Sequence, residues 1–268
     1  MTAAVIPAVG ADARLLPATR SVPKAMMTLV DRPLIDHALA SGITEVALVV
    51  PPGAGALVAW AEETWGSVRG AASVRTVRQP RPLGLGHAVW CARGLLGPDA
   101  SFAVILPDDV IEARTPCLRQ LVEAQGETGG SVVAAMEVPP ERVPDHGILD
   151  VGGSAARLAW VAGMVEKPFL ERAPSRLAAV GRYVLAPEVL ARLDGSCRRA
   201  GGGETDLAGA VSAEARSARG VHALRFEGQR HDCGTKAGLL RANLALGLAH
   251  PGLGPGFAAD VRAAAAAL

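Results

Sequence analysis

The sequence predicts an α/β fold in which helices cover both faces of a largely parallel sheet. Short apolar runs rich in β-branched residues recur along the chain, and helical periodicity fills several of the gaps between them. Strands that alternate with helices in this way are typical of βαβ units. The expected strands cover residues 3–9, 46–50, 103–106, 131–138, 181–185 and 221–226, and the expected helices cover residues 57–64, 86–95, 117–125, 175–179 and 236–250.

The size of the chain agrees with one large domain or two small ones. It has 268 residues, half of them apolar, which is enough to bury a substantial core. We predict a single domain over residues 1–250 and a tail rich in Ala, Gly and Pro over residues 251–268. The end of this tail, 258–268, reads as a docking helix or a frayed end. Glycine and proline predict loops at residues 51–55, 79–86, 139–147 and 201–203.

The charge and cysteine content exclude several classes of protein. A net charge of +1 gives no basic surface for nucleic acid or for an anionic membrane. No apolar stretch approaches the roughly 20 residues of a membrane span, and no basic segment precedes the first apolar run, so we expect a cytoplasmic protein. The four cysteines form no C-x-x-C pair, which favours reduced thiols over a zinc site.

The residues after the first strand are suited to bind phosphate. Ligands of open α/β sheets bind beyond the carboxyl ends of the strands. Here Gly10 opens a loop of small residues, and Arg14 and Lys24 follow it. Such a loop can present backbone N–H groups to a phosphate while the two cations add positive charge. The alternative is an ordinary turn followed by two surface cations.

Five motifs follow one another along the chain. They are R-L-L-P-A-T-R-S-V-P-K-A-M at residues 14–26, Q-P-R-P-L-G-L-G-H-A at 79–88, L-P-D-D at 106–109, E-K-P at 166–168 and D-C-G-T-K at 232–236. In this order they resemble the motifs of the bacterial UTP–glucose-1-phosphate uridylyltransferases, and the first resembles the N-terminal signature of that family. The resemblance extends from residue 3 to about residue 248. It implies a Rossmann-like three-layer nucleotidyltransferase fold with a mixed, mostly parallel central sheet.

The same resemblance implies a role for each motif. Arg14 and Lys24 would hold a triphosphate, Gln79 and the backbone of Gly84 would face uracil, and Asp108 and Asp232 would bind Mg²⁺. Glu166 and Lys167 would form the element that holds the sugar phosphate, and Gly10 and Gly147 belong to matched substrate-binding segments. The implied partners are UTP and glucose 1-phosphate, and relatives of this kind commonly form homo-oligomers.

These assignments also agree with the chemistry of the side chains. Two carboxylates from distant strands can hold one Mg²⁺ between a nucleotide phosphate and a sugar phosphate. Alternatively, Asp108, and more readily Asp109, caps the following helix. The amide of Gln79 has both a donor and an acceptor, as the edge of uracil or thymine requires, although a loop glutamine is usually only solvated.

Lys167 and Glu166 suit the sugar phosphate. Pro168 should keep Lys167 extended, in reach of the phosphate, and Glu166 could accept hydrogen bonds from two sugar hydroxyls. The alternative is an exposed ion pair on a turn, which adds little to stability.

The N-terminal loop departs from the family pattern. The family reads G-x-G-T-R where this chain has G-A-D-A-R at residues 10–14, so that Asp12 replaces a glycine and Ala13 a threonine. Two like charges ~4 Å apart repel by about 4 kcal/mol at an effective dielectric constant of 20. Asp12 should therefore weaken triphosphate binding unless it becomes a ligand of Mg²⁺.

Smaller departures occur elsewhere. Ala25 replaces an acidic residue, the motif at 203–209 ends in Gly209 instead of an acid, and the segments after Pro33 and between residues 50 and 79 are short.

Three hypotheses follow from these motifs. In the first, the protein is an enzyme that forms UDP-glucose and pyrophosphate from UTP and α-D-glucose 1-phosphate. In the second, motivated by Asp12 and Ala13, it is a non-catalytic regulatory paralogue that binds a sugar nucleotide. In the third, it is a thymidylyltransferase that uses dTTP, because one methyl group on the base discriminates weakly.

Overall fold

The computed structural model describes residues 3–10, 13–38, 43–68, 73–201 and 203–267. Its main sheet has ten strands. They are β1 (Ala3–Pro7), β4 (Glu45–Val50), β5 (Ser73–Arg78), β6 (Phe102–Ile105), β8 (Ser131–Glu137), β9 (Gly147–Asp150), β10 (Leu158–Val161), β11 (Gly163–Glu166), β12 (Leu177–Leu185) and β13 (Val221–Arg225). Two small sheets pair β2 (Thr28–Leu29) with β3 (Arg32–Pro33) and β7 (Asp109–Glu112) with β14 (Gln229–Asp232).

The main sheet is mixed and mostly parallel, as predicted. Eight strands lie in the order β10-β13-β8-β12-β6-β1-β4-β5. β12 runs antiparallel to both neighbours and β10 runs antiparallel to β13, whereas the other six strands of this order share one direction. β9 pairs with both β11 and β12.

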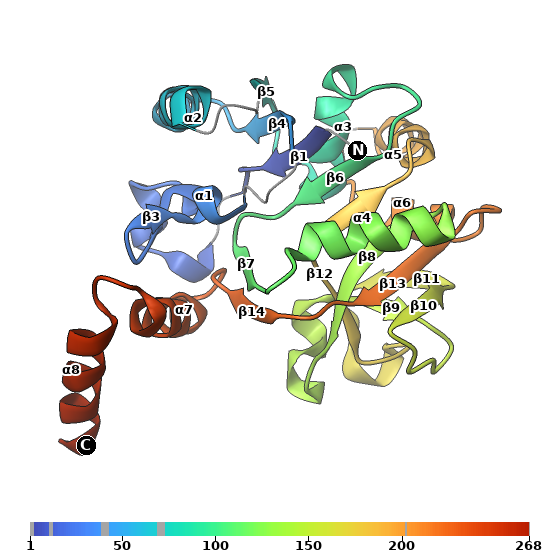
Figure 1. Ribbon diagram of the computed structural model, residues 1–268. Helices are drawn as coiled ribbons and strands as arrows, with labels where there is room; N and C mark the ends of the chain where they lie inside the picture. The colour runs from blue at the N-terminus through green and yellow to red at the C-terminus, as the bar shows by residue number, and fades with distance from the viewer. Residues whose placement is uncertain (1–2, 11–12, 39–42, 69–72, 202, 268) are drawn as a thin grey trace.

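Helices cover both faces of this sheet, so the fold has three layers (Figure 1). The helices are α1 (Leu34–Ala38), α2 (Gly55–Val68), α3 (Gly84–Cys91), α4 (Cys117–Thr128), α5 (Glu188–Arg199), α6 (Leu207–Glu214), α7 (Lys236–Ala249) and α8 (Gly254–Ala266). Short 3-10 turns cover Ala13–Leu15, Ala18–Arg20, Lys24–Met26, Ala92–Leu95, Pro140–Asp145 and Leu170–Arg172.

Alternating side chains of the central strands build a separate core on each face. Val5 of β1 packs in the core that contains residues of α3, α5 and α6. The next residue, Ile6, packs in the core that contains residues of α1, α2 and α4. Successive side chains of a strand point to opposite faces, so one apolar run supplies both cores. This is why the central strands read as continuous apolar segments in the sequence.

The prediction of a helix over residues 175–179 is wrong. Residues 175 and 176 precede β12 and residues 177–179 belong to it, and β12 lies between β6 and β8 in the middle of the sheet. Leu177, Ala178 and Val180 are almost fully buried, because the sheet is covered on both faces. Alanine-rich sequence is compatible with a helix, but packing against two neighbouring strands determines the conformation here.

The helix predicted over residues 236–250 is confirmed as α7. It begins at the cap residue Thr235, whose hydroxyl accepts a hydrogen bond from the backbone N–H of Gly238 at 3.0 Å. After a short break, α8 packs on α7 and extends away from the sheet to the C-terminal end (Figure 1). No helix within the described ranges combines the length and the apolar character of a membrane span.

Candidate active site

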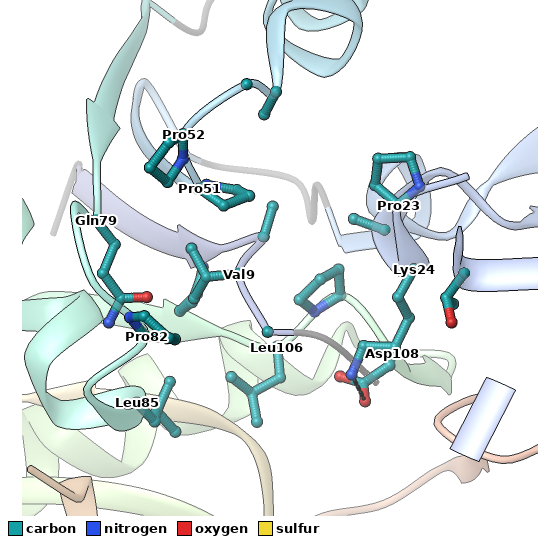
Figure 2. Close-up of a pocket in the computed structure, with 18 of the residues that line it drawn as sticks. Val9, Pro23, Lys24, Pro51, Pro52, Gln79, Pro82, Leu85, Leu106 and Asp108 are labelled. Atoms are coloured by element: carbon teal, nitrogen blue, oxygen red, sulfur yellow. Dashed lines mark hydrogen bonds and ion pairs between the residues drawn. The ribbon is translucent and has the colours of Figure 1, made fainter. Parts of the chain in front are cut away.

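The first of two adjoining cavities lies at the carboxyl ends of four parallel strands. It measures about 800 Å³. Residues that follow each strand line it: Val9 and Gly10 after β1, Pro51 and Pro52 after β4, Gln79 after β5, and Leu106 and Asp108 after β6 (Figure 2). Gly10, with φ +110°, adopts a conformation that favours glycine. The cavity is therefore at the edge of the sheet where open α/β folds bind ligands.

Gln79 is held in a defined orientation at this cavity. Its side chain is buried, and its Nε2 donates to the carbonyl oxygen of Gly84 at 3.0 Å. The same nitrogen lies 3.0 Å from Nδ1 of His87. Figure 2 shows the amide oxygen of Gln79 on the side of the cavity. Gln79 therefore presents a hydrogen-bond acceptor to a ligand.

Gly84 also lines the first cavity, and close packing in the structure requires a glycine at this position. A Cβ there would lie 2.6 Å from the carbonyl oxygen of Thr205. The backbone N–H of Thr205 in turn donates to the carbonyl oxygen of Leu83 at 2.8 Å. The glycine thus lets a neighbouring loop approach the start of α3, a contact that the sequence pattern does not reveal.

A second cavity, of about 740 Å³, adjoins the first. Its lining includes the predicted residues Arg14, Gly147, Glu166, Lys167 and Asp232. Four residues line both cavities: Leu85, Leu106, Asp108 and Glu204. Of the predicted site residues, Gly10, Lys24, Gln79 and Gly84 line the first cavity, and Asp108 lies where the two meet.

Several charged groups converge at Asp108. Nζ of Lys24 lies 2.8 Å from Oδ2 of Asp108. A Cβ on Gly234 would lie 2.9 Å from Oδ2 of Asp108, 3.2 Å from Oδ1 of Asp232 and 3.2 Å from Nη2 of Arg14. Both carboxylates and the arginine therefore surround one point, although they come from distant parts of the chain.

Strand pairing brings the two carboxylates together. β7 and β14 are antiparallel, with Asp109 opposite Asp232. Beyond this pair, the backbone N–H of Cys233 donates to the carbonyl oxygen of Asp108 at 2.8 Å. Because Asp108 directly precedes β7, this pairing fixes its position beside Asp232.

Positive groups keep Asp232 charged. Burial alone would raise the pKa of its carboxyl, but Arg230, the backbone N–H of Gly234 and Arg142 together lower that pKa. Nη2 of Arg142 donates to Oδ2 of Asp232 at 3.0 Å, and Nε of Arg142 donates to Asp145 at 2.7 Å. Asp232 therefore remains an anion at neutral pH and can attract a cation.

The donor set fits Mg²⁺ that is shared with a substrate. Within the described ranges, no group of three or more His, Cys, Asp or Glu side chains is arranged to hold a metal. Mg²⁺ is usually bound by one or two carboxylates together with substrate phosphates and water. Asp108 and Asp232 match that arrangement, and a metal enclosed by protein ligands alone would need more donors.

Asp109 is not a helix cap, contrary to one interpretation of the sequence. It begins β7, and its Oδ2 accepts a hydrogen bond from the backbone N–H of Gly181 at 2.7 Å. Its Oδ1 accepts from Nε of Arg230 at 2.6 Å. Asp109 thus joins β7, β12 and β14 at the wall of the second cavity.

Glu166 and Lys167 lie together on the wall of the second cavity. Glu166 ends β11 opposite Gly147 of β9, and Nζ of Lys167 lies 3.5 Å from Oε1 of Glu166. The backbone of Lys167 is left-handed, with φ +45°, rather than extended as Pro168 predicts. Its N–H donates to the carbonyl oxygen of His146 at 2.9 Å. A non-glycine residue in this conformation is strained and often marks a functional site.

Sequence reasoning missed other residues of the second cavity, notably His146 and Arg230. Burial, and then the charge of Arg230, lowers the pKa of His146 to about 4, so its ring is neutral at physiological pH. One signal was available for Arg230: it lies two residues before Asp232 on β14, and such residues face the same side of a strand. His146 precedes the matched residue Gly147 and carries no comparable signal.

The substitution at Asp12 lies outside the described residues. Ala13 and Arg14 follow it in the first 3-10 turn. Arg14 lines the second cavity beside Asp108 and Asp232, while Thr19, Arg20 and Ser21 line the first cavity near Lys24. The cationic groups of the N-terminal segment are thus distributed over both cavities.

Comparisons with known proteins agree with this geometry. Residues 3–247 match the nucleotidyl transferase family. A UTP–glucose-1-phosphate uridylyltransferase of Komagataeibacter xylinus is 39% identical over 256 residues, covering 87% of this chain and 89% of the relative. The structure of UTP-bound UGPase from Acinetobacter baumannii has a TM-score of 0.84 and 33% identity, covering 97% of this chain and 98% of that one.

A third relative was solved with a sugar nucleotide. This UDP-glucose pyrophosphorylase, complexed with UDP-glucose, has a TM-score of 0.82 and 31% identity, covering 92% of this chain and 98% of that one. The family resemblance seen in the motifs is confirmed. The chain therefore belongs to the nucleotidyl transferase family, among the bacterial UTP–glucose-1-phosphate uridylyltransferases.

Proposed function

We propose that this protein forms UDP-glucose and pyrophosphate from UTP and α-D-glucose 1-phosphate. The observation that carries the proposal is the position of Asp108, which lines both cavities and lies beside Lys24, Arg14 and Asp232. A nucleotide in the first cavity and a sugar phosphate in the second would meet at this point. Relatives with bound UTP and with bound UDP-glucose support this choice of substrates.

The reaction requires positioning and charge stabilisation more than covalent catalysis. An oxygen of the sugar phosphate attacks the α-phosphorus of UTP in line, and the bond to the β-phosphate breaks to release pyrophosphate. The nucleophile is already an anion, so no protein base is needed. Lys24 and Arg14 are placed to stabilise the negative charge of the phosphates, as cationic clamps do in phosphoryl transfer.

The second cavity would hold the sugar phosphate. Lys167 supplies a cation for the phosphate, and Glu166 beside it supplies acceptors for sugar hydroxyls. Asp108 and Asp232 would hold Mg²⁺ together with substrate phosphates. When bound, the ion neutralises phosphate charge and makes the α-phosphorus more electrophilic.

Phosphorus NMR of the purified protein with Mg²⁺, UTP and glucose 1-phosphate tests the proposal. We expect the signals of UDP-glucose and pyrophosphate to appear in equal amounts as those of the substrates decline. Folded protein that leaves both substrates unchanged would contradict the proposed activity. Substituting dTTP in the same experiment tests the thymidylyltransferase alternative, since faster conversion of dTTP than of UTP would favour it.

The altered N-terminal loop is the reason to test the non-catalytic alternative. Replacing Asp12 by Gly and Ala13 by Thr restores the family pattern. A protein that is inactive until both residues are replaced would be the regulatory paralogue. Activity in the natural protein with no large gain in the double variant would reject that alternative.

The homo-oligomer implied by the resemblance remains a prediction. Static light scattering should give a mass of at least twice the 27.4 kDa of one chain. A single 27.4 kDa species at working concentration would contradict it.

A further inference from the structure

Gln79 contacts the first cavity, but His87 behind it determines which atom of Gln79 a base can meet. His87 lies one turn into α3, is buried and lines neither of the two cavities. Its Nδ1 is 3.0 Å from Nε2 of Gln79. His87 can therefore affect a ligand of the first cavity through the amide of Gln79, without lining that cavity itself.

The hydrogen bonds leave one possible orientation for this amide. The carbonyl oxygen of Gly84 can only accept, so the amide atom 3.0 Å from it must be the nitrogen. The second N–H of that nitrogen points to Nδ1 of His87, which accepts when the ring carries its proton on Nε2. Both donors of Gln79 are then used within the protein, and only the oxygen remains for a ligand.

The surroundings of His87 keep it in the accepting form. Burial, followed by the charges of Arg81 and Arg93, lowers the pKa of the His87 ring, so the ring stays neutral at physiological pH. The ring also stacks on Trp90, with centroids 5.8 Å apart. Its backbone N–H donates to the carbonyl oxygen of Thr205 at 3.3 Å. Position and protonation are thus both fixed before a nucleotide binds.

We propose that His87 is a positioning residue that holds Gln79 as a pure hydrogen-bond acceptor and thereby selects pyrimidines with a protonated N3 over cytosine. Uracil and thymine carry a donor at N3, whereas cytosine carries an acceptor there. A fixed carbonyl oxygen accepts a hydrogen bond from the N3–H of uracil or thymine. With cytosine, the same oxygen faces the lone pair of N3. An amide that could rotate would accommodate both. This inference rests on the proposed function, because it assumes that the base lies beside Gln79.

Binding of UMP and CMP to three proteins, measured by calorimetry, tests the proposal without requiring turnover. His87→Leu removes the acceptor, and His87→Asn restores an oxygen acceptor near the position of Nδ1. We expect His87→Leu to lower the preference for UMP over CMP by about tenfold or more, the effect of one buried hydrogen bond. His87→Asn should recover most of that preference. If His87→Leu does not fold, His87→Phe, which retains a ring against Trp90, replaces it.

Steady-state kinetics add a second readout. In His87→Leu, the KM for UTP should rise while kcat changes by less than about threefold, because His87 touches no reacting atom. His250→Leu, at a half-buried histidine directly after α7 and outside both cavities, is the matched control and should behave as wild type.

The outcomes separate the two proposals. An unchanged UMP preference in His87→Leu, or the same loss in His87→Asn as in His87→Leu, would overturn the role of His87 and leave the proposed function intact. A wild-type protein that binds UMP no better than CMP would overturn both the role of His87 and the assigned base.

Discussion

Asp108 is one of the four residues that line both cavities. It lines each of them, contacts Lys24 at 2.8 Å, and lies next to Asp232 across Gly234. Its side chain is about one-fifth exposed, so a ligand can reach it. Loss of its charge should therefore affect the reaction far more than the stability of the fold.

Asp108→Asn is expected to lower kcat by at least about 100-fold, because the amide cannot stabilise a cation between two phosphates as a carboxylate does. Circular dichroism should show an unchanged fold. Asp99→Asn, at an exposed aspartate in the turn before β6, serves as control. Turnover of Asp108→Asn close to that of Asp99→Asn would refute the assigned role.

Lys167→Gln should raise the KM for glucose 1-phosphate by about tenfold, the usual effect of losing one charged hydrogen bond. The KM for UTP should change little, because Lys167 lines only the second cavity. The matched control is Lys236→Gln, at an exposed lysine at the start of α7. An equal rise in both KM values would argue against separate sites for the two substrates.

At the scale of elements, close contact between α3 and the loop at 204–206 shapes the first cavity. A Cβ on Gly86 would lie 2.5 Å from the carbonyl oxygen of Asp206. Asp206 is itself fixed, because it caps α6 through a 2.6 Å hydrogen bond from the N–H of Gly209. Neither backbone can move without disturbing another element.

Gly86→Ala should therefore destabilise the protein by about 1–3 kcal/mol, as overpacking does, and should weaken UMP binding because α3 carries Gly84 and His87. Urea denaturation and calorimetry measure the two effects. Gly126→Ala is the control: nothing lies within 4 Å of a Cβ at this position of α4, and alanine should stabilise the helix by about 0.5–1 kcal/mol. Equal stability of the two variants would contradict this reading of the α3 contact.

The helices and strands differ in how well the sequence predicts them. The buried parallel strands and the helices α2, α3, α4 and α7 were predictable, because continuous apolar runs and helical periodicity mark them clearly. The exposed edge strand β5, with the sequence SVRTVR, was missed because its two apolar residues, Val74 and Val77, are three positions apart and do not alternate with polar ones. The strand β12 was partly misread as a helix, since neighbouring strands rather than local propensity determine it.

The site could be predicted only where ordered motifs exist. Asp108, Asp232, Lys24 and Gln79 were predicted because each lies within a matched motif. His146 and Arg230 line the second cavity but belong to no motif. Arg230 lies there because β14 pairs with the distant strand β7. Sequence spacing alone does not report such pairing.

At the scale of the whole molecule, acid should weaken the fold through its buried and half-buried histidines. The pKa values of His37, His87, His146 and His222 are all lowered, in each case mainly by burial. Below the ordinary histidine pKa of 6.5, the unfolded chain therefore binds more protons than the folded one. The stability that depends on neutral rings is complete above pH 6.5 and is lost as the pH falls toward the lowered values.

Urea denaturation should accordingly show a free energy of unfolding at least about 1 kcal/mol lower at pH 5 than at pH 7. Burial raises the pKa of Asp109, so protonation of this carboxyl stabilises the folded state as the pH falls. This single group opposes the effect of four histidines. His222→Phe keeps a ring against Trp160 and removes one titrating group, so its stability should depend less on pH. A free energy of unfolding that is constant from pH 7 to pH 5 would contradict this expectation.

The most direct test of the central claim is pyrophosphate release from wild-type protein and Asp108→Asn, with Mg²⁺, glucose 1-phosphate and each of UTP, dTTP, ATP, CTP and GTP. We expect release with UTP that exceeds release with every other nucleotide and that Asp108→Asn nearly abolishes. Folded wild-type protein that releases no pyrophosphate with any of the five, or that prefers a purine nucleotide, would contradict the claim.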